Sequence, residues 1–378
     1  MTMRFLAISA LLASLAAAQQ RHKLVINAET PEGQILQQIG QESDDTKKVA
    51  LIDDYLAKYP QHEGVTWALG QSQPALLKLG LFDRAMEAGD KALAIDPTDL
   101  DISYNALKAA EGKKDPDAVM KWSERTSAIA RTIVGAAKPD DEDEAKQRAD
   151  YAKQIDTYTE YALYASALQP GSGPKITTLV EALMARNPKS QYLPKLYGAY
   201  LNAASQGGNP DKTVAAADKV LAADPTNENA LLTSANTNMT RNKNPEKVIE
   251  CANKLVEVMS SKPLPEGMSE ADWNKKKTTM IGLGHWMAGV TAAAQGKLAD
   301  ADKALRAALP DIKDNSQLLG IGLFQLGLAD YKMGKSGKNK ALIQDALRFS
   351  TQSAAIKGPF QTQAATNVKA IKQELGLK

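Results

Sequence analysis

Apolar residues recur at three- and four-residue spacing along most of the chain. Alanine and leucine supply many of these positions, and glycine or an Asn-Pro step separates one run from the next. This spacing is typical of amphipathic α-helices, in which one stripe of side chains faces a core. No competing pattern of alternating apolar and polar residues indicates strands. The pattern therefore predicts an all-α protein.

The sequence repeats itself at an interval of 34–35 residues. Residues 209–214 return 35 residues later as residues 244–249, and residues 81–86 are matched 34 residues on by residues 115–120. Two helical runs fit within each interval. An interval of this size indicates stacked helix pairs, because a single pair cannot bury its apolar face alone.

Three of the predicted second helices end at a polar residue followed by proline. These steps are Asp96-Pro97, Asn187-Pro188 and Asp224-Pro225. Proline disfavours the helical conformation of the residue before it, so we expect each helix to end there. Small residues are expected where helices cross closely. The candidate crossing residues are Ala85, Ala92, Ala199, Ala215, Ala217, Ala288, Ala301 and Ala308.

Several segments resemble the tetratricopeptide repeat (TPR) family of helix pairs. The best local match, Leu326 to Lys335, resembles the end of a first helix and its turn, and residues 288–305 and 80–97 resemble further units. The resemblance covers residues 31–360 in about seven or eight pairs. It implies an α-solenoid of stacked antiparallel helix pairs, wound as a right-handed superhelix, with residues 361–378 as a capping helix. The pattern departs from the family in a lengthened first helix within residues 139–188 and an insertion near residues 260–274.

The beginning of the chain indicates export. Met1 to Arg4 supply positive charge, residues 5–18 are an uncharged, mainly apolar run, and Ala16 to Ala18 form a site that signal peptidase accepts. The run of 14 residues is shorter than the ~20 of a membrane-spanning helix. We therefore expect a cleaved signal peptide over residues 1–18, a flexible mature start over 19–30, and a periplasmic or secreted bacterial protein without a stable membrane anchor. A lipoprotein is not expected, because no cysteine lies near the cleavage site.

Composition narrows the classes of function. The 46 Lys and Arg residues oppose 44 Asp and Glu residues, a net charge of +2, so no nucleic-acid partner is expected. Three histidines and one cysteine leave few groups for catalysis or metal binding. The single cysteine, Cys251, is expected to be a small buried side chain. We accordingly predict no enzyme activity, no cofactor and no metal site.

Candidate chemical motifs have simpler explanations. Gly334-Lys335-Ser336 has Ala329 where a phosphate-binding loop requires glycine, and a helix precedes it where that loop follows a strand. His62 and His285 lack the spacing of a zinc site. The acidic run from Asp140 to Glu144 lacks the glycine and alternating ligands of a calcium loop, and suits a helix start.

The resemblance implies that a partner binds on a concave face lined mainly by the first helix of each pair. The candidate residues there combine aromatic anchors with hydrogen-bonding groups, which suit an extended peptide or a partner helix. They are Trp67, Tyr104, Lys108, Asn202, Thr237, Arg241, Trp286, Phe324 and Tyr331. The aromatic members have an alternative role in packing between helices, above all Trp286 and Phe324.

The leading hypothesis is a non-enzymatic scaffold that binds a protein or peptide, with a role in cell-envelope assembly or trafficking. One alternative is a carbohydrate-binding or carbohydrate-processing helical-repeat protein, because two carboxylates at a set separation suffice for glycosidase chemistry. The low aromatic content, 5%, counts against a sugar-binding cleft. Another alternative is a self-assembling structural repeat. The partner and the oligomeric state stay open.

Overall fold

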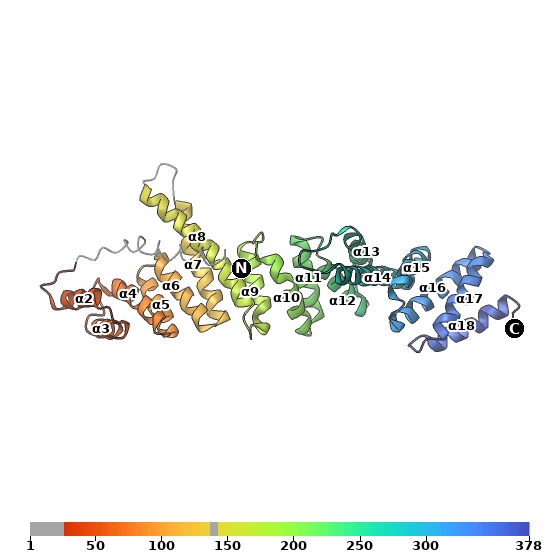
Figure 1. The fold of residues 1–378 in the computed structure, drawn as a ribbon, viewed down its shortest axis with the longest axis horizontal. Helices are drawn as coiled ribbons and strands as arrows, with labels where there is room; N and C mark the ends of the chain where they lie inside the picture. The colour runs from red at the N-terminus through yellow and green to blue at the C-terminus, as the bar shows by residue number, and fades with distance from the viewer. Residues whose placement is uncertain (1–25, 137–142, 378) are drawn as a thin grey trace. The chain divides into compact units, whose positions relative to one another are not determined.

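The computed structural model describes residues 26–136 and 143–377, and every regular element in them is helical (Figure 1). The chain divides into two compact units, unit 1 ending at Leu196 and unit 2 beginning at Tyr197. The predicted signal peptide and residues 19–25 lie outside the described residues. No described helix combines the length and apolar character needed to cross a bilayer.

The first helices of the chain, up to the one that contains the unit boundary, are α2 (Pro31–Gln41), α3 (Asp45–Lys58), α4 (Val65–Lys78), α5 (Phe82–Ile95), α6 (Leu100–Lys113), α7 (Pro116–Ala136), α8 (Asp143–Ala167), α9 (Ile176–Arg186) and α10 (Leu193–Gln206). A short 3-10 helix, η1 (Gly173–Lys175), precedes α9. The remaining helices are α11 (Pro210–Ala223), α12 (Glu228–Thr240), α13 (Pro245–Ser261), α14 (Glu270–Ala294), α15 (Leu298–Ile312), α16 (Ser316–Ser336), α17 (Lys340–Ala354) and α18 (Gln361–Glu374).

Helices of neighbouring pairs stack in a regular order. In unit 1 each helix from α2 to α9 packs against the next, and in unit 2 the same holds from α11 to α18. The even-numbered helices also contact one another directly, α2 with α4, α4 with α6 and α6 with α8 in unit 1, and α12 with α14 and α14 with α16 in unit 2. We call the even-numbered helices first helices and the odd-numbered ones second helices. This packing confirms the predicted all-α solenoid of stacked helix pairs.

The predicted helix ends are confirmed at all three proline steps. Helices α5, α9 and α11 end directly before Asp96, Asn187 and Asp224, and the backbone of each of these residues leaves the helical region. The two copies of the 35-residue repeat begin equivalent second helices, since Asn209 precedes α11 and Asn244 precedes α13. Local sequence therefore sets where the second helices start and stop.

Ion pairs recur at equivalent places in successive pairs. At four junctions an acidic side chain in the first turn of a second helix meets a cation that follows in the chain. Three of the cations lie at or directly after the end of the next first helix, and the fourth, Lys175, lies in η1 before α9. The pairs are Asp45 with Lys78, Asp83 with Lys113, Asp117 with Lys175, and Asp211 with Arg241. Each acid also lies at the positive end of its helix dipole. Exposed pairs of this kind contribute little stability, so they mark the register of the repeat more than they hold it together.

Small residues lie at most of the predicted helix crossings. Six of the eight candidate alanines are buried, namely Ala85, Ala92, Ala217, Ala288, Ala301 and Ala308. Ala199 is half-buried, and the prediction for Ala215 is wrong because its side chain is exposed. The neighbouring Ala216 is buried instead, at 3% exposure. A shift of one residue turns a helical side chain by about 100°, which is enough to move it from the core to the surface.

The expected turn within residues 326–335 is also wrong, because α16 continues to Ser336. Gly334 is helical and lies against the start of α17. A Cβ at this position would lie 2.8 Å from Ile343 Cγ1 and 3.0 Å from the Asn339 carbonyl oxygen. The glycine therefore permits close approach of two helices, and the phosphate-loop reading of residues 334–336 has no structural support.

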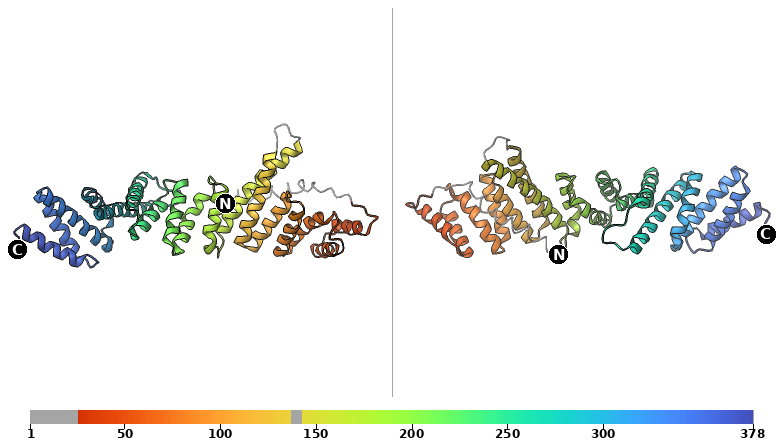
Figure 2. Two further views of the ribbon diagram at one scale, coloured as in Figure 1. Left: turned by 180° about the vertical axis from the view of Figure 1, so that it is seen from behind. Right: turned by 45° about the horizontal axis from the view of Figure 1, so that its top comes forward.

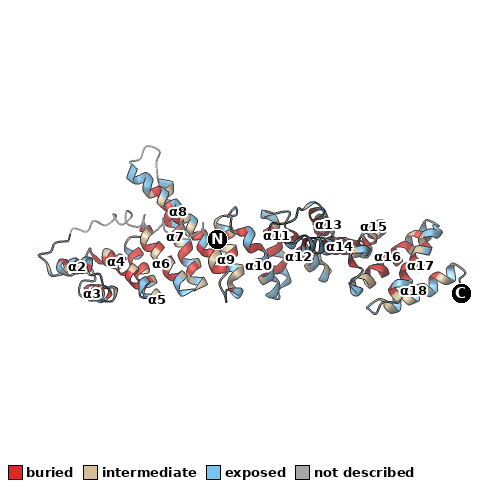
Figure 3. Cartoon of the chain, in the orientation of Figure 1, coloured by how far each residue is buried: buried red, intermediate tan, exposed pale blue. Residues whose placement is uncertain are grey.

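Two elements depart from the regular repeat. Helix α8 is 25 residues long, as predicted for a lengthened first helix, and together with α7 it extends beyond its neighbours in unit 1 (Figure 2). Residues 143–147 at its start are exposed (Figure 3). In unit 2, residues 262–269 connect α13 to α14, in the region where the insertion was predicted.

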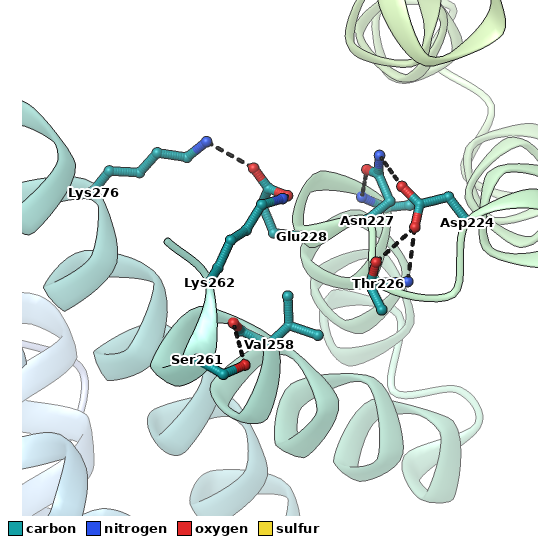
Figure 4. A network of polar contacts seen from close by, with 9 residues as sticks. Asp224, Thr226, Asn227, Glu228, Val258, Ser261, Lys262 and Lys276 are labelled. Atoms are coloured by element: carbon teal, nitrogen blue, oxygen red, sulfur yellow. Dashed lines mark hydrogen bonds and ion pairs between the residues drawn. The ribbon is translucent and has the colours of Figure 1, made fainter. Parts of the chain in front are cut away.

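A buried carboxylate links the start of this connection to α14 (Figure 4). Glu228 begins α12 and is only 8% exposed. It receives Lys262 Nζ at 2.6 Å from the start of the connection and Lys276 Nζ at 2.9 Å from α14. Although burial opposes its charge, the hydrogen bonds from the two lysines dominate and lower the pKa of Glu228 to about 2.

Candidate functional site

A polar cluster joins two first helices of unit 1. Tyr158 on α8 donates its hydroxyl to the Glu111 carboxylate on α6, at 2.8 Å to Oε2. Lys108, also on α6, donates to the same hydroxyl at 2.6 Å and pairs with Glu111 at 3.2 Å. Tyr104 meets the Tyr158 ring edge to face, with centroids 5.4 Å apart. These contacts fix the Tyr158 ring in one orientation.

Further tyrosines continue this cluster along α8. The Tyr158 and Tyr161 centroids are 5.8 Å apart, and Tyr161 lies 6.3 Å from Tyr164. Tyr192, in the turn before α10, stacks on Tyr164 at 5.0 Å. We call Tyr104, Tyr158, Tyr161, Tyr164 and Tyr192 the tyrosine surface.

The members of the tyrosine surface differ in burial, and Tyr161, in the middle of the row on α8, is the most exposed of them. Tyr104 is 7% exposed, whereas Tyr161 is 43% exposed. Burial, reinforced by the Glu111 charge, raises the pKa of Tyr104 to about 12. The same two causes raise the pKa of Tyr158 further. The hydroxyls of Tyr104 and Tyr158 therefore stay protonated at physiological pH and act as neutral hydrogen-bonding groups.

The spacing of residues in α8 produces this surface. Tyr158, Tyr161 and Tyr164 follow one another at intervals of three residues, which places them on one side of the helix. Leu168, the first residue after α8, is 52% exposed and adds an apolar side chain. The opposite side, which includes Ile155 and Leu163, is buried in the core. Core packing of α8 thus leaves the tyrosine side facing outward.

The chemistry of the tyrosine surface is that of recognition. It offers ring faces, phenolic hydroxyls and the ammonium groups of two lysines. Lys108 bonds to the Tyr158 hydroxyl, and Lys195 Nζ lies 5.9 Å from the centroid of the Tyr164 ring. Tyrosines of this kind contribute large contact area and hydrogen bonding at a small cost in side-chain entropy. Over the described ranges, no group of three or more His, Cys, Asp or Glu side chains is placed to hold a metal ion.

The single cysteine and the two described histidines are held in packing or local hydrogen bonds. Cys251 is 2% exposed and, as predicted, packs in the core; burial raises the pKa of its thiol. His62 Nδ1 accepts from the Gly64 backbone N–H and lies 2.7 Å from the Tyr55 hydroxyl. Desolvation lowers the pKa of His285. These positions supply packing and local hydrogen bonds.

Of the predicted site residues, the structure brings Tyr104 and Lys108 together. Both belong to α6 and both contact Tyr158. The other four members of the tyrosine surface were not predicted from the sequence, namely Tyr158, Tyr161, Tyr164 and Tyr192. The signal that was available is the helical spacing of the tyrosines in α8, which puts several rings on one stripe next to α6.

Three predicted residues of unit 2 connect helices. Trp286 packs in the core and donates its indole N–H to the Leu318 carbonyl oxygen at 3.0 Å. Phe324 is 9% exposed and stacks on Phe360, with centroids 4.4 Å apart. Tyr331 donates its hydroxyl to Glu374 of α18. These contacts correspond to the packing alternative, so we place no partner contact on them.

The other predicted residues are dispersed. Trp67 is half-buried on α4, beside Gly40 of α2. Asn202 is exposed on α10, and Thr237 is half-buried on α12. Arg241 follows α12 directly and forms the Asp211 pair of the repeat junction, at 2.6 Å. None of these four belongs to the tyrosine surface.

Comparisons with known proteins leave the family of this chain open. No protein-family profile and no curated protein matches the sequence. Among solved structures, the TPR domain of P58(IPK) is 9% identical, with 92% of this chain and 99% of that one covered and a TM-score of 0.26. Yeast Tom70 is 13% identical, with 92% and 97% covered and a TM-score of 0.25. At these TM-scores neither likeness bears on fold or function, and the solenoid assignment rests on the helix contacts of this chain.

Proposed function

We propose that this chain is a non-enzymatic scaffold that binds another protein, and that an extended segment of the partner lies along the tyrosine surface of unit 1. The observation that carries this proposal is the row of mutually packed rings on α8, in which Tyr161 is 43% exposed and Tyr158 and Tyr164 are half-buried. Contiguous aromatic side chains that reach the protein surface are characteristic of interaction surfaces.

The surface is organised before a partner arrives. Tyr158 is held by Lys108 and Glu111, and Tyr164 is held by its stack on Tyr192. Ordering interface side chains costs about 0.5–1.5 kcal/mol each, so rings that are already fixed reduce the cost of binding. An extended peptide suits a row of rings on one helix, because it offers backbone amides to the hydroxyls and side chains to the ring faces.

Export of the mature chain belongs to the same proposal. The charged start, the apolar run over residues 5–18 and the small residues before Gln19 support a cleaved signal peptide and a periplasmic or secreted location. A role in cell-envelope assembly or trafficking follows from that location. The partner is then an envelope or exported protein that presents an extended segment.

Retention of a partner by the immobilised mature chain tests the proposal. Envelope extract is passed over the wild type, Tyr161→Ala, Tyr164→Ala and the control Ile95→Ala, which removes an apolar side chain, 61% exposed, at the end of α5. We expect a protein that wild type and Ile95→Ala retain equally and that each tyrosine variant binds about tenfold or more weakly, the loss of a strong interface contact.

Two outcomes would overturn this assignment. Equal retention by Tyr161→Ala and wild type would exclude the tyrosine surface as the binding site. Competition by soluble envelope glycans, with no protein retained, would instead support the carbohydrate-binding alternative, because sugars also stack on aromatic rings. Circular dichroism of each variant checks that its helices are intact.

A further inference from the structure

Three carboxylates surround one guanidinium where α15, α16 and α17 meet in unit 2. Arg306 on α15 donates Nη2 to Asp330 Oδ2 at 2.6 Å and Nε to Asp302 Oδ1 at 2.6 Å. The same Nη2 lies 3.1 Å from Asp345 Oδ2 on α17. Arg348 pairs with the other Asp345 oxygen at 2.8 Å. One cationic side chain thus links carboxylates from three helices.

Asp330 is the buried member of this cluster. Its side chain is 0% exposed, whereas those of Asp302 and Asp345 are 24% and 34% exposed. Asp330 Oδ1 is buried and has no hydrogen-bond partner. An ionised carboxylate oxygen in this position would be neither solvated nor paired, which is costly in a protein interior.

A proton on Asp330 resolves this conflict. It converts the carboxyl into a donor, and the Asp302 side chain is within hydrogen-bonding reach of it. It also makes the net charge of the cluster zero. Two carboxylates then remain, opposite two guanidinium groups: Asp302 and Asp345 with Arg306 and Arg348. The burial of Asp330 and the charge balance of the cluster therefore favour a neutral Asp330 held by Arg306.

We propose that Asp330 makes the α15–α16–α17 junction a pH-sensitive clasp, closed while Asp330 is protonated and loosened when it ionises. The groups that face Asp330 are Asp302 and Arg306 from α15 and Asp345 from α17, with Arg348 on the far side of Asp345. Within the described chain, no charged side chain of α14, which also contacts α16, pairs with Asp330.

The direction of the pH effect follows from the folded environment. Burial, then the hydrogen bond with Asp302, raises the pKa of Asp330 to about 7 from its ordinary value of 3.8. When the junction opens and Asp330 meets water, its pKa returns toward the ordinary value. The closed form therefore holds a proton that the open form releases, so opening becomes more frequent as pH rises between these two values and levels off above about pH 7.

Hydrogen exchange of the full chain measures this opening. Exchange of the α16 and α17 backbone amides, corrected for the intrinsic effect of pH, is followed from pH 5 to pH 8. In wild type we expect the opening equilibrium to increase by up to tenfold per pH unit and to level off near pH 7. In Asp330→Asn, whose side chain is neutral at every pH, the opening equilibrium should be independent of pH. The control Asp314→Asn, in the exposed turn before α16, should behave as wild type.

A second variant keeps the proposal testable if Asp330→Asn fails to fold. Asp302→Asn removes one neighbouring charge and the acceptor of the proposed proton, so opening should level off at a lower pH than in wild type. A wild-type profile that is flat between pH 5 and pH 7, or one that Asp330→Asn and Asp302→Asn both leave unchanged, would contradict the clasp.

Discussion

Trp122→Ala is expected to lower the free energy of unfolding by about 3–5 kcal/mol, the range for removing a large buried ring. Trp122 on α7 is 1% exposed, and its ring lies against Gly89 of α5. Lys121 and Arg125 place their cationic groups over the ring, and both pair with Asp90 of α5. The variant therefore leaves a cavity beside Gly89, between α7 and α5. Urea unfolding followed by circular dichroism measures the loss.

Trp67→Ala is the matched control for this prediction. Trp67 belongs to the same unit but is only half-buried, so its removal creates less cavity and should cost less stability. A loss at position 122 equal to or below the loss at position 67 would contradict the packing described for α7. The slope of the unfolding transition should stay unchanged in both variants.

Glu228→Gln is expected to cost about 2–3 kcal/mol at neutral pH. Lowering a carboxyl pKa by one unit corresponds to about 1.4 kcal/mol of stabilisation, and the partial exposure of Lys262 and Lys276 reduces the full effect of the pair. The variant also leaves two ammonium groups close together without their counter-charge. Lys262, at the start of the connection, and Lys276, on α14, then lose their common attachment to α12.

The pH dependence identifies the cause of this loss. The pKa of Glu228 is lowered on folding, so its stabilisation is complete well above the ordinary value of 4.5 and is lost as pH falls toward about 2. The difference between wild type and Glu228→Gln should be largest at pH 7 and fall to less than half of that at pH 3. The control Glu266→Gln, on an exposed side chain of the same connection, should match wild type. A constant difference at all pH values would contradict the ionic origin.

The helical architecture could be predicted because its signals are local. A proline after Asp96, Asn187 or Asp224 acts on the residue beside it, and the repeat interval needs no knowledge of distant contacts. The two errors, at Ala215 and at the end of α16, arise where the local sequence is not sufficient. Adjacent residues of a helix point to different sides, so the buried position can be misplaced by one residue. A glycine in a helix is distinguished from a turn glycine only by the neighbour that packs on it.

The candidate site was predicted only in part, because its members come together through packing. Tyr104 and Tyr158 are far apart in the sequence and meet only when α6 and α8 align. Trp286 and Phe324 have the residue types of binding anchors, yet their partners are a carbonyl oxygen on α16 and the Phe360 ring. Residue type alone cannot separate a packed aromatic side chain from one that faces a partner.

Site-specific photocrosslinking at the most exposed residue of the tyrosine surface tests the central claim most directly. A photoreactive phenylalanine analogue replaces Tyr161, and in a second chain it replaces Ile95, which is exposed but lies outside this surface. After irradiation in the envelope, mass spectrometry maps the attached peptides. The account predicts that position 161 captures one extended segment of a single partner protein and that position 95 does not. Capture of that segment from position 95 with none from position 161 would contradict it.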